Sequence, residues 1–161
     1  MTVEEYNRGV DKYADGLYRF VLKNLKDEHM SSDIIQDTFE KLWMKIENVS
    51  ALKVKTYLFT TAYHTMIDYI RKEKKYTDGN LDGFNEPSHS GQYSDLGEVL
   101  EIAVGNLPED QKAVVMLRDY EGYSYRDIAE ITGLTESQVK VYIYRARVFL
   151  KNYIGSIEQV I

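Results

Sequence analysis

The sequence predicts an all-α protein made of two small helical domains. Apolar residues recur at intervals of three or four through most of the chain, whereas the alternation typical of strands is scarce. Proline, which breaks regular helices, occurs only 2 times in 161 residues. A stretch without a sustained period, residues 76–95, separates the two patterned parts. We therefore expect one domain over residues 1–75, a flexible acidic linker over 76–95, and a second domain over 96–161.

Three helices are expected in the first domain. The first covers residues 3–25, and the second begins at Ser31 or Ser32, either of which can cap it. The third covers about residues 53–73 and ends in a run of lysine and arginine, which the helix dipole favours at a C-terminus. The second helix should run to about residue 47, and its buried face should comprise Ile35, Phe39, Leu42 and Ile46.

The second domain is expected to begin with two helices and a short third one. The first spans residues 96–107, and Pro108 opens the second at a position where its missing N–H is not needed. The short third helix is capped by Ser124, with Asp127 three residues on in a capping-box position.

The end of the chain has the spacing of a helix-turn-helix. The pair Thr135–Gln138 forms a capping box at the start of a final helix that runs to about Tyr153. Ala129 is small where the two helices would cross, Gly133 permits a left-handed turn, and Val139 would fill the junction. The alternative is a plain αα-hairpin within a helical bundle.

The final helix has two distinct faces at about 100° per residue. The stripe expected to face the core comprises Val139, Ile143, Ala146 and Leu150. The opposite arc mixes cations with apolar and aromatic residues, which suits phosphates, base edges and thymine methyl groups. The predicted DNA-contacting residues of this helix are Lys140, Val141, Tyr144, Arg145, Arg147 and Lys151.

Charge is segregated along the chain, although the net charge of −6 argues at first against binding nucleic acid. Residues 51–75 hold six Lys or Arg against two Asp or Glu, and residues 134–153 hold four against one. Residues 76–110 hold eight Asp or Glu and no Lys or Arg. Because a phosphate backbone responds to local patches, the two basic segments are candidate nucleic-acid surfaces. Ordinary solvated helix faces are the alternative.

The segment 53–75 interleaves aromatic residues with its cations. Such a pattern suits single-stranded nucleic acid, because bases stack on the rings while cations hold the backbone. Aromatic residues at helical spacing are also common in protein cores, so the pattern alone leaves both readings open.

The second helix has an acidic outer face beside a tryptophan, with Met44 also pointing outward, as is typical of a protein-docking surface. Metal binding by its carboxylates is the alternative, but no histidine or glycine-turned loop joins them. The histidines His29, His64 and His89 lack ligand spacing, and no residue set suggests catalysis or a cofactor. The predicted docking residues are Asp33, Gln36, Asp37, Glu40 and Trp43.

Composition excludes several other classes of protein. The hydrophobic fraction of 43% is enough for folded cores, and no apolar run approaches the roughly 20 residues of a membrane span. Without cysteine the chain has no disulfides, thiolate metal sites or cysteine nucleophiles, which fits a reducing compartment. The acidic N-terminus has no apolar signal core, so we expect a cytoplasmic protein.

An acidic docking helix, a basic aromatic helix, an acidic linker and a helix-turn-helix together resemble the sigma-70 family of bacterial RNA polymerase specificity subunits. The group that fits is the extracytoplasmic-function (ECF) type, which keeps only the second and fourth conserved regions. Residues 32–46 resemble its core-binding segment, residues 52–75 its promoter-melting and −10-reading segment, and residues 107–147 its −35-binding region. Asp127 stands where glutamate is common, and His64 falls where family members differ.

The resemblance implies a non-catalytic initiation factor. Its first domain would dock on the β′ clamp helices of polymerase and hold a flipped −10 base, while its second would bind the −35 major groove and the β flap. An anti-sigma factor is a further implied partner. The alternatives are a helix-turn-helix regulator that is no polymerase subunit, and a helical adaptor that binds only proteins. The implied −10 residues are Lys53, Lys55, Tyr57, Tyr63, His64, Arg71 and Lys72.

Overall fold

A computed structural model describes residues 1–77 and 96–158, and all regular elements within these residues are helical. The predicted all-α class is confirmed for this part of the chain, whereas the expected linker lies outside it from residue 78 onward. None of the described helices is both long and apolar enough to cross a membrane. The helices are α1 (Val3–Leu25), α2 (Glu28–Met44), α3 (Val54–Thr77), α4 (Leu96–Gly105), α5 (Glu109–Val115), α6 (Tyr125–Thr132) and α7 (Glu136–Glu158).

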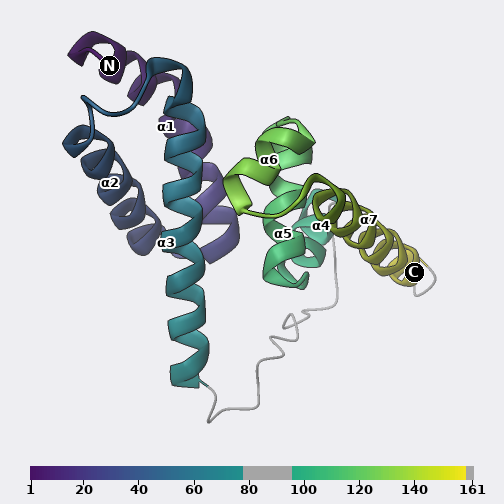
Figure 1. Cartoon of the computed structure of the whole chain (residues 1–161). Helices are drawn as coiled ribbons and strands as arrows, with labels where there is room; N and C mark the ends of the chain where they lie inside the picture. Colours follow the sequence, from purple (N-terminus) through teal and green to yellow (C-terminus); the bar gives the residue numbers. More distant parts are fainter. Residues whose placement is uncertain (78–95, 159–161) are drawn as a thin grey trace.

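Helices α1, α2 and α3 pack side by side as the first of two helical units (Figure 1). Each contributes large side chains that are fully buried, so the unit has a core of its own. A short 3₁₀ turn, η1 (Ala51–Lys53), leads into α3 and is capped by Ser50. The largest buried side chains of this unit are Leu17, Phe20, Leu42, Leu58, Phe59 and Met66.

Helices α1 and α3 approach most closely at Gly9. A Cβ atom at this position would lie 2.8 Å from Cγ1 of Val54, a separation too short for two carbon atoms. Glycine therefore allows the contact, and Val54, the first residue of α3, is itself buried. The start of α3 and the η1 turn before it are thereby held against α1.

Helix α2 is capped four or five residues earlier than the sequence pattern predicts. Its cap is Asp27, whose Oδ1 accepts the backbone N–H of Met30 at 3.0 Å. Capping by Ser31 or Ser32 is therefore wrong, because the Ser31 side chain is buried inside the helical part of the chain. An aspartate here also places a negative charge at the positive end of the helix dipole.

The buried face of α2 also differs from the prediction. Ile34, Thr38 and Leu42 face the core, and the Thr38 hydroxyl donates to the Ile34 carbonyl at 2.7 Å. Because that bond satisfies the hydroxyl, a threonine can occupy a fully buried position that a search for apolar residues overlooks. Of the predicted face only Leu42 is fully buried, and the residues left half-buried are Ile35, Phe39 and Ile46.

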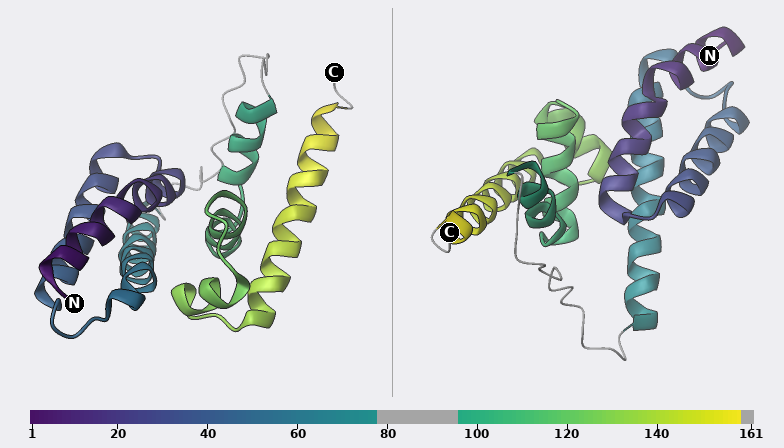
Figure 2. Two further views of the ribbon diagram at one scale, coloured as in Figure 1. Left: turned by 90° about the horizontal axis from the view of Figure 1, so that it is seen from above. Right: turned by 180° about the vertical axis from the view of Figure 1, so that it is seen from behind.

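Helices α4 to α7 form the second unit, seen beside the first in Figure 2. A π-type turn, η2 (Met116–Tyr120), continues α5, and Gly122 follows it with φ of 74°. Pro108 precedes α5 as expected. Helix α3 extends to Thr77, four residues past its predicted end and into the predicted linker.

The helix-turn-helix is confirmed in α6 and α7. Gly133 ends α6 in the left-handed conformation with φ of 77°, and Val139 is fully buried at the junction. The capping box forms as predicted: Gln138 Oε1 accepts the Thr135 N–H at 2.9 Å, and Thr135 Oγ1 accepts the Gln138 N–H at 3.1 Å. The predicted core stripe is buried at Val139, Ile143 and Ala146 and half-buried at Leu150.

The two units are in direct contact. Helix α6 lies against α3 beside its middle, and α5 contacts α1 (Figure 1). Buried residues of both units belong to one continuous hydrophobic cluster. Phe59 of α3 lies at the joint, because its ring contacts Phe20 of α1 at 5.8 Å and Tyr123 of the second unit at 5.1 Å between centroids.

Candidate nucleic-acid and protein-docking interface

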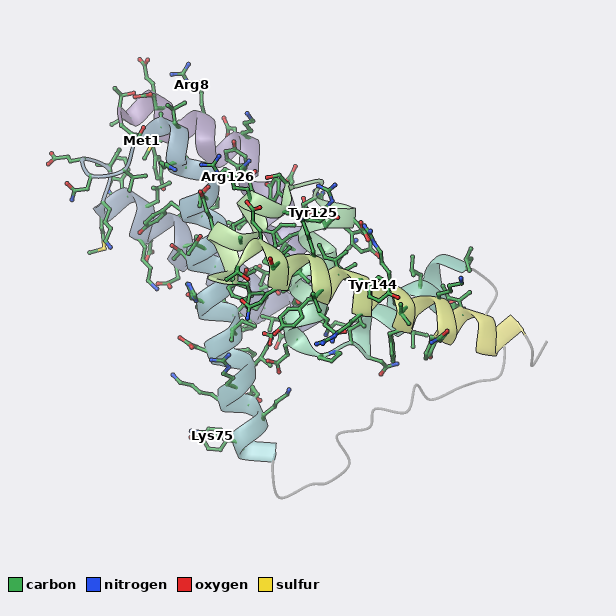
Figure 3. All side chains as sticks on the ribbon, turned by 45° about the vertical axis from the view of Figure 1, so that its right-hand side comes forward. Met1, Arg8, Lys75, Tyr125, Arg126 and Tyr144 are labelled. Carbon is green, nitrogen blue, oxygen red and sulfur yellow. The ribbon has the colours of Figure 1, made fainter. Side chains whose placement is uncertain are left out.

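The outer face of α7 carries all six residues predicted to contact DNA, and each of them is exposed. Tyr144 is 69% exposed and Val141 is 43% exposed, although both are large and apolar. Figure 3 shows Tyr144 on α7, the helix that extends away from the first unit. The helix therefore presents a mixed cationic, apolar and aromatic surface, which is the composition that base-edge contacts require.

The cations of this face differ in how far they are already engaged. Arg147 binds Asp119 through two hydrogen bonds, with Nη2–Oδ1 at 2.6 Å and Nε–Oδ2 at 3.4 Å. This hydrogen bonding raises the pKa of Arg147. The Lys140 ammonium lies 5.7 Å from the ring centroid of Tyr125. Arg145 has no ion-pair partner within the described part of the chain, which leaves its guanidinium accessible to an external ligand.

The predicted −10 residues on and before α3 fall into two groups. Lys53, His64, Arg71 and Lys72 are exposed, and Tyr57 is half-buried. Tyr63 is a core residue with 6% exposure. Its pKa is raised to about 12, mainly by burial and to a smaller extent by the nearby negative charge of Asp110. The His64 ring packs edge-on against Tyr63 at 5.5 Å. In this arrangement the Tyr63 ring is not accessible to a stacking base.

Lys55 is held by the second unit. Its ammonium donates to Asp127 Oδ2 of α6 at 2.9 Å and lies 4.8 Å from the Tyr123 ring centroid. Asp127 was expected to complete a capping box, and that expectation is only half right. Its backbone N–H donates to Ser124 Oγ at 3.0 Å, while its carboxylate binds Lys55 instead of turning back to the cap.

The predicted docking residues lie together on α2. Asp33, Gln36, Glu40 and Trp43 are exposed and Asp37 is half-buried. Trp43 is 49% exposed and packs edge-on against Tyr6 of α1 at 5.1 Å. An open groove of about 450 Å³ runs between the two helices here, and its lining residues are Tyr6, Gln36, Phe39, Glu40, Trp43 and Met44.

Part of the acidic charge on α2 is compensated within the helix. Asp37 pairs with Lys41 at 3.0 Å, and Asp33 lies 3.8 Å from His29. Glu40 borders the apolar groove, as Trp43 does. Within residues 1–77 and 96–158, no group of three or more potential ligands is placed to hold a metal ion. The arrangement suits a partner that brings an apolar side chain and a cation.

Sequence reasoning missed three carboxylates that bind the cations of candidate surfaces or of α1. Asp119 binds Arg147, Glu121 binds Arg19, and Asp127 binds Lys55. These partners are distant in sequence, so no local spacing could have identified them. The other missed residue is Leu52, which is 93% exposed on the η1 turn before α3. An isolated leucine next to Lys53 gives no signal in a pattern search.

The chain matches two family models in the order in which the units occur. Residues 10–76 match the model described as "Sigma-70 region 2", and residues 97–150 match "Sigma-70, region 4". The first match covers α3 and most of α1, together with α2, and the second covers the helix-turn-helix. The predicted docking and −10 residues and the outer face of α7 up to residue 150 lie within the matched residues, whereas Tyr6 of the groove precedes them.

Curated relatives and solved structures are similar over nearly the whole chain. The ECF RNA polymerase sigma factor SigM of Bacillus subtilis (strain 168) is 30% identical over 159 residues, covering 94% of each chain. RNA polymerase sigma factor SigV of the same strain is 29% identical, covering 85% of this chain and 83% of that one. The sigma factor RpoE from Bartonella quintana, solved in complex with the anti-sigma factor NepR, has a TM-score of 0.77 and 25% identity, covering 95% of this chain and 98% of that one.

Proposed function

We propose which surface of the chain makes each contact needed for transcription initiation, because the chain belongs to the sigma-70 family of RNA polymerase sigma factors, in the ECF group. The protein is a polymerase-binding factor that directs initiation at specific promoters, a role that is not catalytic. The observation that carries this conclusion is the ordered pair of region 2 and region 4 matches, supported by a relative that is similar over 94% of the chain.

The −35 element is assigned to the outer face of α7. Lys140, Val141, Tyr144 and Arg145 lie along the first half of the helix, the part that a recognition helix inserts most deeply into the major groove. Lys151 is two to three turns further on and is placed to meet only phosphate. Arg147 is engaged by Asp119, so we assign it to phosphate contact and to holding α7 in place.

The −10 element is assigned to the η1 turn and the accessible residues of α3. Lys53, His64, Arg71 and Lys72 are exposed and available to hold a single strand by its backbone. Tyr57 is partly accessible, and Leu52 offers an apolar surface at the turn. Lys55 and Tyr63 would join this surface once the second unit has moved away and the helix face has become accessible.

The groove between α1 and α2 is assigned to the binding of core polymerase. Trp43 supplies the large, partly exposed aromatic group that commonly dominates the energy of an interface. Glu40 and Gln36 at the rim can pair with polar or basic groups of the partner, while Met44 adapts to its shape. We assign the docking partner on polymerase as the β′ clamp helices, and the β flap as a second contact of the helix-turn-helix unit.

The function is tested by adding the purified chain to core RNA polymerase and sequencing the 5′ ends of transcripts made from genomic DNA fragments. We expect start sites that share upstream elements and that depend on the chain. A regulator that is no polymerase subunit would bind DNA tightly alone and would leave core polymerase without specific starts. Substituting Trp43→Ala should reduce these transcripts, whereas Val3→Ala, another exposed apolar position outside the groove, should not.

An anti-sigma factor is proposed as the regulatory partner. The support is the similarity to RpoE from Bartonella quintana, which was solved with its anti-sigma factor NepR. Because polymerase works in the cytoplasm, we place the function there. Expression of the tagged chain in its own host, followed by crosslinking and purification, should recover a partner that suppresses the transcripts described above; recovery of polymerase subunits without any inhibitor would remove this proposal.

A further inference from the structure

Five methionines supply all the sulfur of this chain, because it has no cysteine. Met66 and Met116 are buried in the core, and the Met116 sulfur also accepts the Asn24 amide at 3.2 Å. Met1 and Met30 are half-buried and pack against the hydrophobic cluster. Four of the five methionine side chains are therefore shielded from solvent, either wholly or in part.

Met44 is the exception, since it is 82% exposed. It is the last residue of α2, and it lines the groove together with aromatic residues such as Phe39 and Trp43. A solvent-exposed thioether is the methionine sulfur that an oxidant reaches first. The surface that we assign to core polymerase thus carries the most exposed sulfur of the chain, and no thiol is present to react in its place.

The reaction expected at this sulfur is a two-electron oxidation by a peroxide. A lone pair of the thioether Sδ attacks one oxygen of hydrogen peroxide, the O–O bond breaks, and an S–O bond forms. The departing hydroxide takes the proton of the transferred oxygen and leaves as water, so the sulfur is oxidised to a sulfoxide and the peroxide is reduced. Methionine sulfoxide reductases reverse the step at the expense of two thiols, which form a disulfide while the oxygen leaves as water.

Oxidation adds a hydrogen-bond acceptor to a groove whose lining residues offer few free donors. The Tyr6 hydroxyl already donates to the Phe39 carbonyl at 3.1 Å. The Gln36 amide lies two helical turns before Met44, and the Trp43 indole projects from the adjacent position, about 100° away around α2. The sulfoxide oxygen therefore depends on water for its hydrogen bonds.

A partner docked in the groove would take that water away. Glu40 lies one turn before Met44 on the same side of α2, and its carboxylate supplies a further acceptor instead of a donor. A polar group that is buried without a hydrogen-bond partner weakens an interface, by roughly tenfold in affinity for one such group. The unoxidised thioether, by contrast, is apolar and flexible, and it adapts to an apolar partner surface.

We propose that Met44 is a reversible oxidation site, at which a peroxide converts the thioether to the sulfoxide and thereby lowers the affinity of the chain for core polymerase. This inference rests on the proposed function, which assigns the groove to polymerase. The reduced chain is competent to bind, whereas the oxidised chain is withheld from initiation until a sulfoxide reductase restores the thioether. Polymerase that is already bound covers the sulfur, so the free chain is the sensitive form.

The first measurement locates the oxidation. The free chain is treated with hydrogen peroxide, and mass spectrometry of its peptides follows the gain of one oxygen atom at each methionine. We expect Met44 to react several times faster than Met30, the half-buried methionine on the same helix. Core polymerase bound before the treatment should protect Met44. Faster oxidation of another methionine, or equal oxidation of Met44 with and without polymerase, would overturn the proposal.

The second measurement compares binding before and after treatment. Peroxide is removed before core polymerase is added, so that only the chain is oxidised, and an equilibrium titration gives the dissociation constant. Oxidation should raise this constant roughly tenfold for the parent chain and for Met30→Leu, with helicity retained in circular dichroism. Treated and untreated samples of Met44→Leu should bind alike, because this variant has no thioether in the groove. Sulfoxide reductases for both epimers should restore the parent constant.

A further variant reproduces the polarity of the sulfoxide without any oxidant. Met44→Gln places an uncharged polar group at the same position, so it should bind core polymerase several times more weakly than Met44→Leu. Equal binding of these two variants would show that the groove tolerates a polar group here, and would contradict the proposed effect of oxidation.

Two outcomes of the titration speak against the oxidation site. One is an oxidised parent chain that binds as tightly as the untreated one; the other is a Met44→Leu variant that loses as much affinity after treatment as the parent does. The untreated parent chain separates these outcomes from failure of the proposed function. If it binds core polymerase and oxidation changes nothing, only the oxidation site is wrong. If it does not bind, the proposed function is wrong and the oxidation site falls with it.

Discussion

Replacing Gly9 by alanine should destabilise the first unit, although alanine is the better helix former. The substitution gains about 1 kcal/mol of helix propensity. Against this, the new Cβ would stand 2.8 Å from Cγ1 of Val54, whereas carbon atoms pack best at about 3.5–4.0 Å. Val54 is buried and β-branched, so its side chain has no free rotamer to adopt. Overpacking of this kind costs about 1–3 kcal/mol, which leaves a net loss of about 1 kcal/mol.

Thermal unfolding followed by circular dichroism measures this loss. For a chain of this size, about 1 kcal/mol lowers the unfolding midpoint by about 2–4 °C. The matched control is Gly105→Ala, because the atom nearest to its new Cβ is the flexible Lys26 Nζ at 3.6 Å. We expect that variant to be as stable as the parent chain or slightly more stable. A Gly9→Ala variant that unfolds at or above the parent midpoint would show that the α1–α3 contact is not tight, and would refute the reasoning.

Four further predictions concern the site and its scaffold. Trp43→Ala should weaken core polymerase binding roughly tenfold or more in an equilibrium titration, with helicity retained. Arg145→Ala should relax preference at one −35 position at a cost of about 1–3 kcal/mol, whereas Arg147→Ala should weaken all −35 variants alike in a promoter panel. Gly133→Ala should cost about 1–2 kcal/mol of stability in denaturant unfolding, because its φ of 77° strains any Cβ. Burial raises the pKa of Tyr63 to about 12. The contribution of its neutral phenol to the free energy of unfolding is therefore complete below about pH 10 and should be lost as the pH rises from about 10 to 12. Over this range the free energy of unfolding of Tyr63→Phe should fall less than that of the parent chain.

The helix-turn-helix could be predicted because its determinants are local. Thr135 and Gln138 cap the same helix end, and Gly133 stands at the one position of the turn that needs a positive φ. The outward face of α7 could be predicted from the helical period of the apolar residues alone, because the buried stripe leaves only the opposite side exposed. Such features depend on residues a few positions apart, and a single sequence contains all of them.

The buried face of α2 and the partners of the candidate cations could not be predicted in this way. Thr38 is buried because its hydroxyl donates to a carbonyl one turn back, and Ile34 takes the buried position that the pattern assigned to Ile35. Lys55 and Asp127 are 72 positions apart, so their pairing depends on how the two units meet. Tertiary packing decides such contacts, and local periodicity does not report it.

Helix α3 is the element that both units share. Leu58 is buried in the first unit, Phe59 touches aromatic rings of both, and Lys53 and Arg71 remain for nucleic acid. Nearly every side of this helix therefore carries a separate constraint, and few of its positions are free to vary without effect. Sequence change should consequently be slow along α3 and faster on the solvent side of α1, where a residue such as Asp11 is exposed to water.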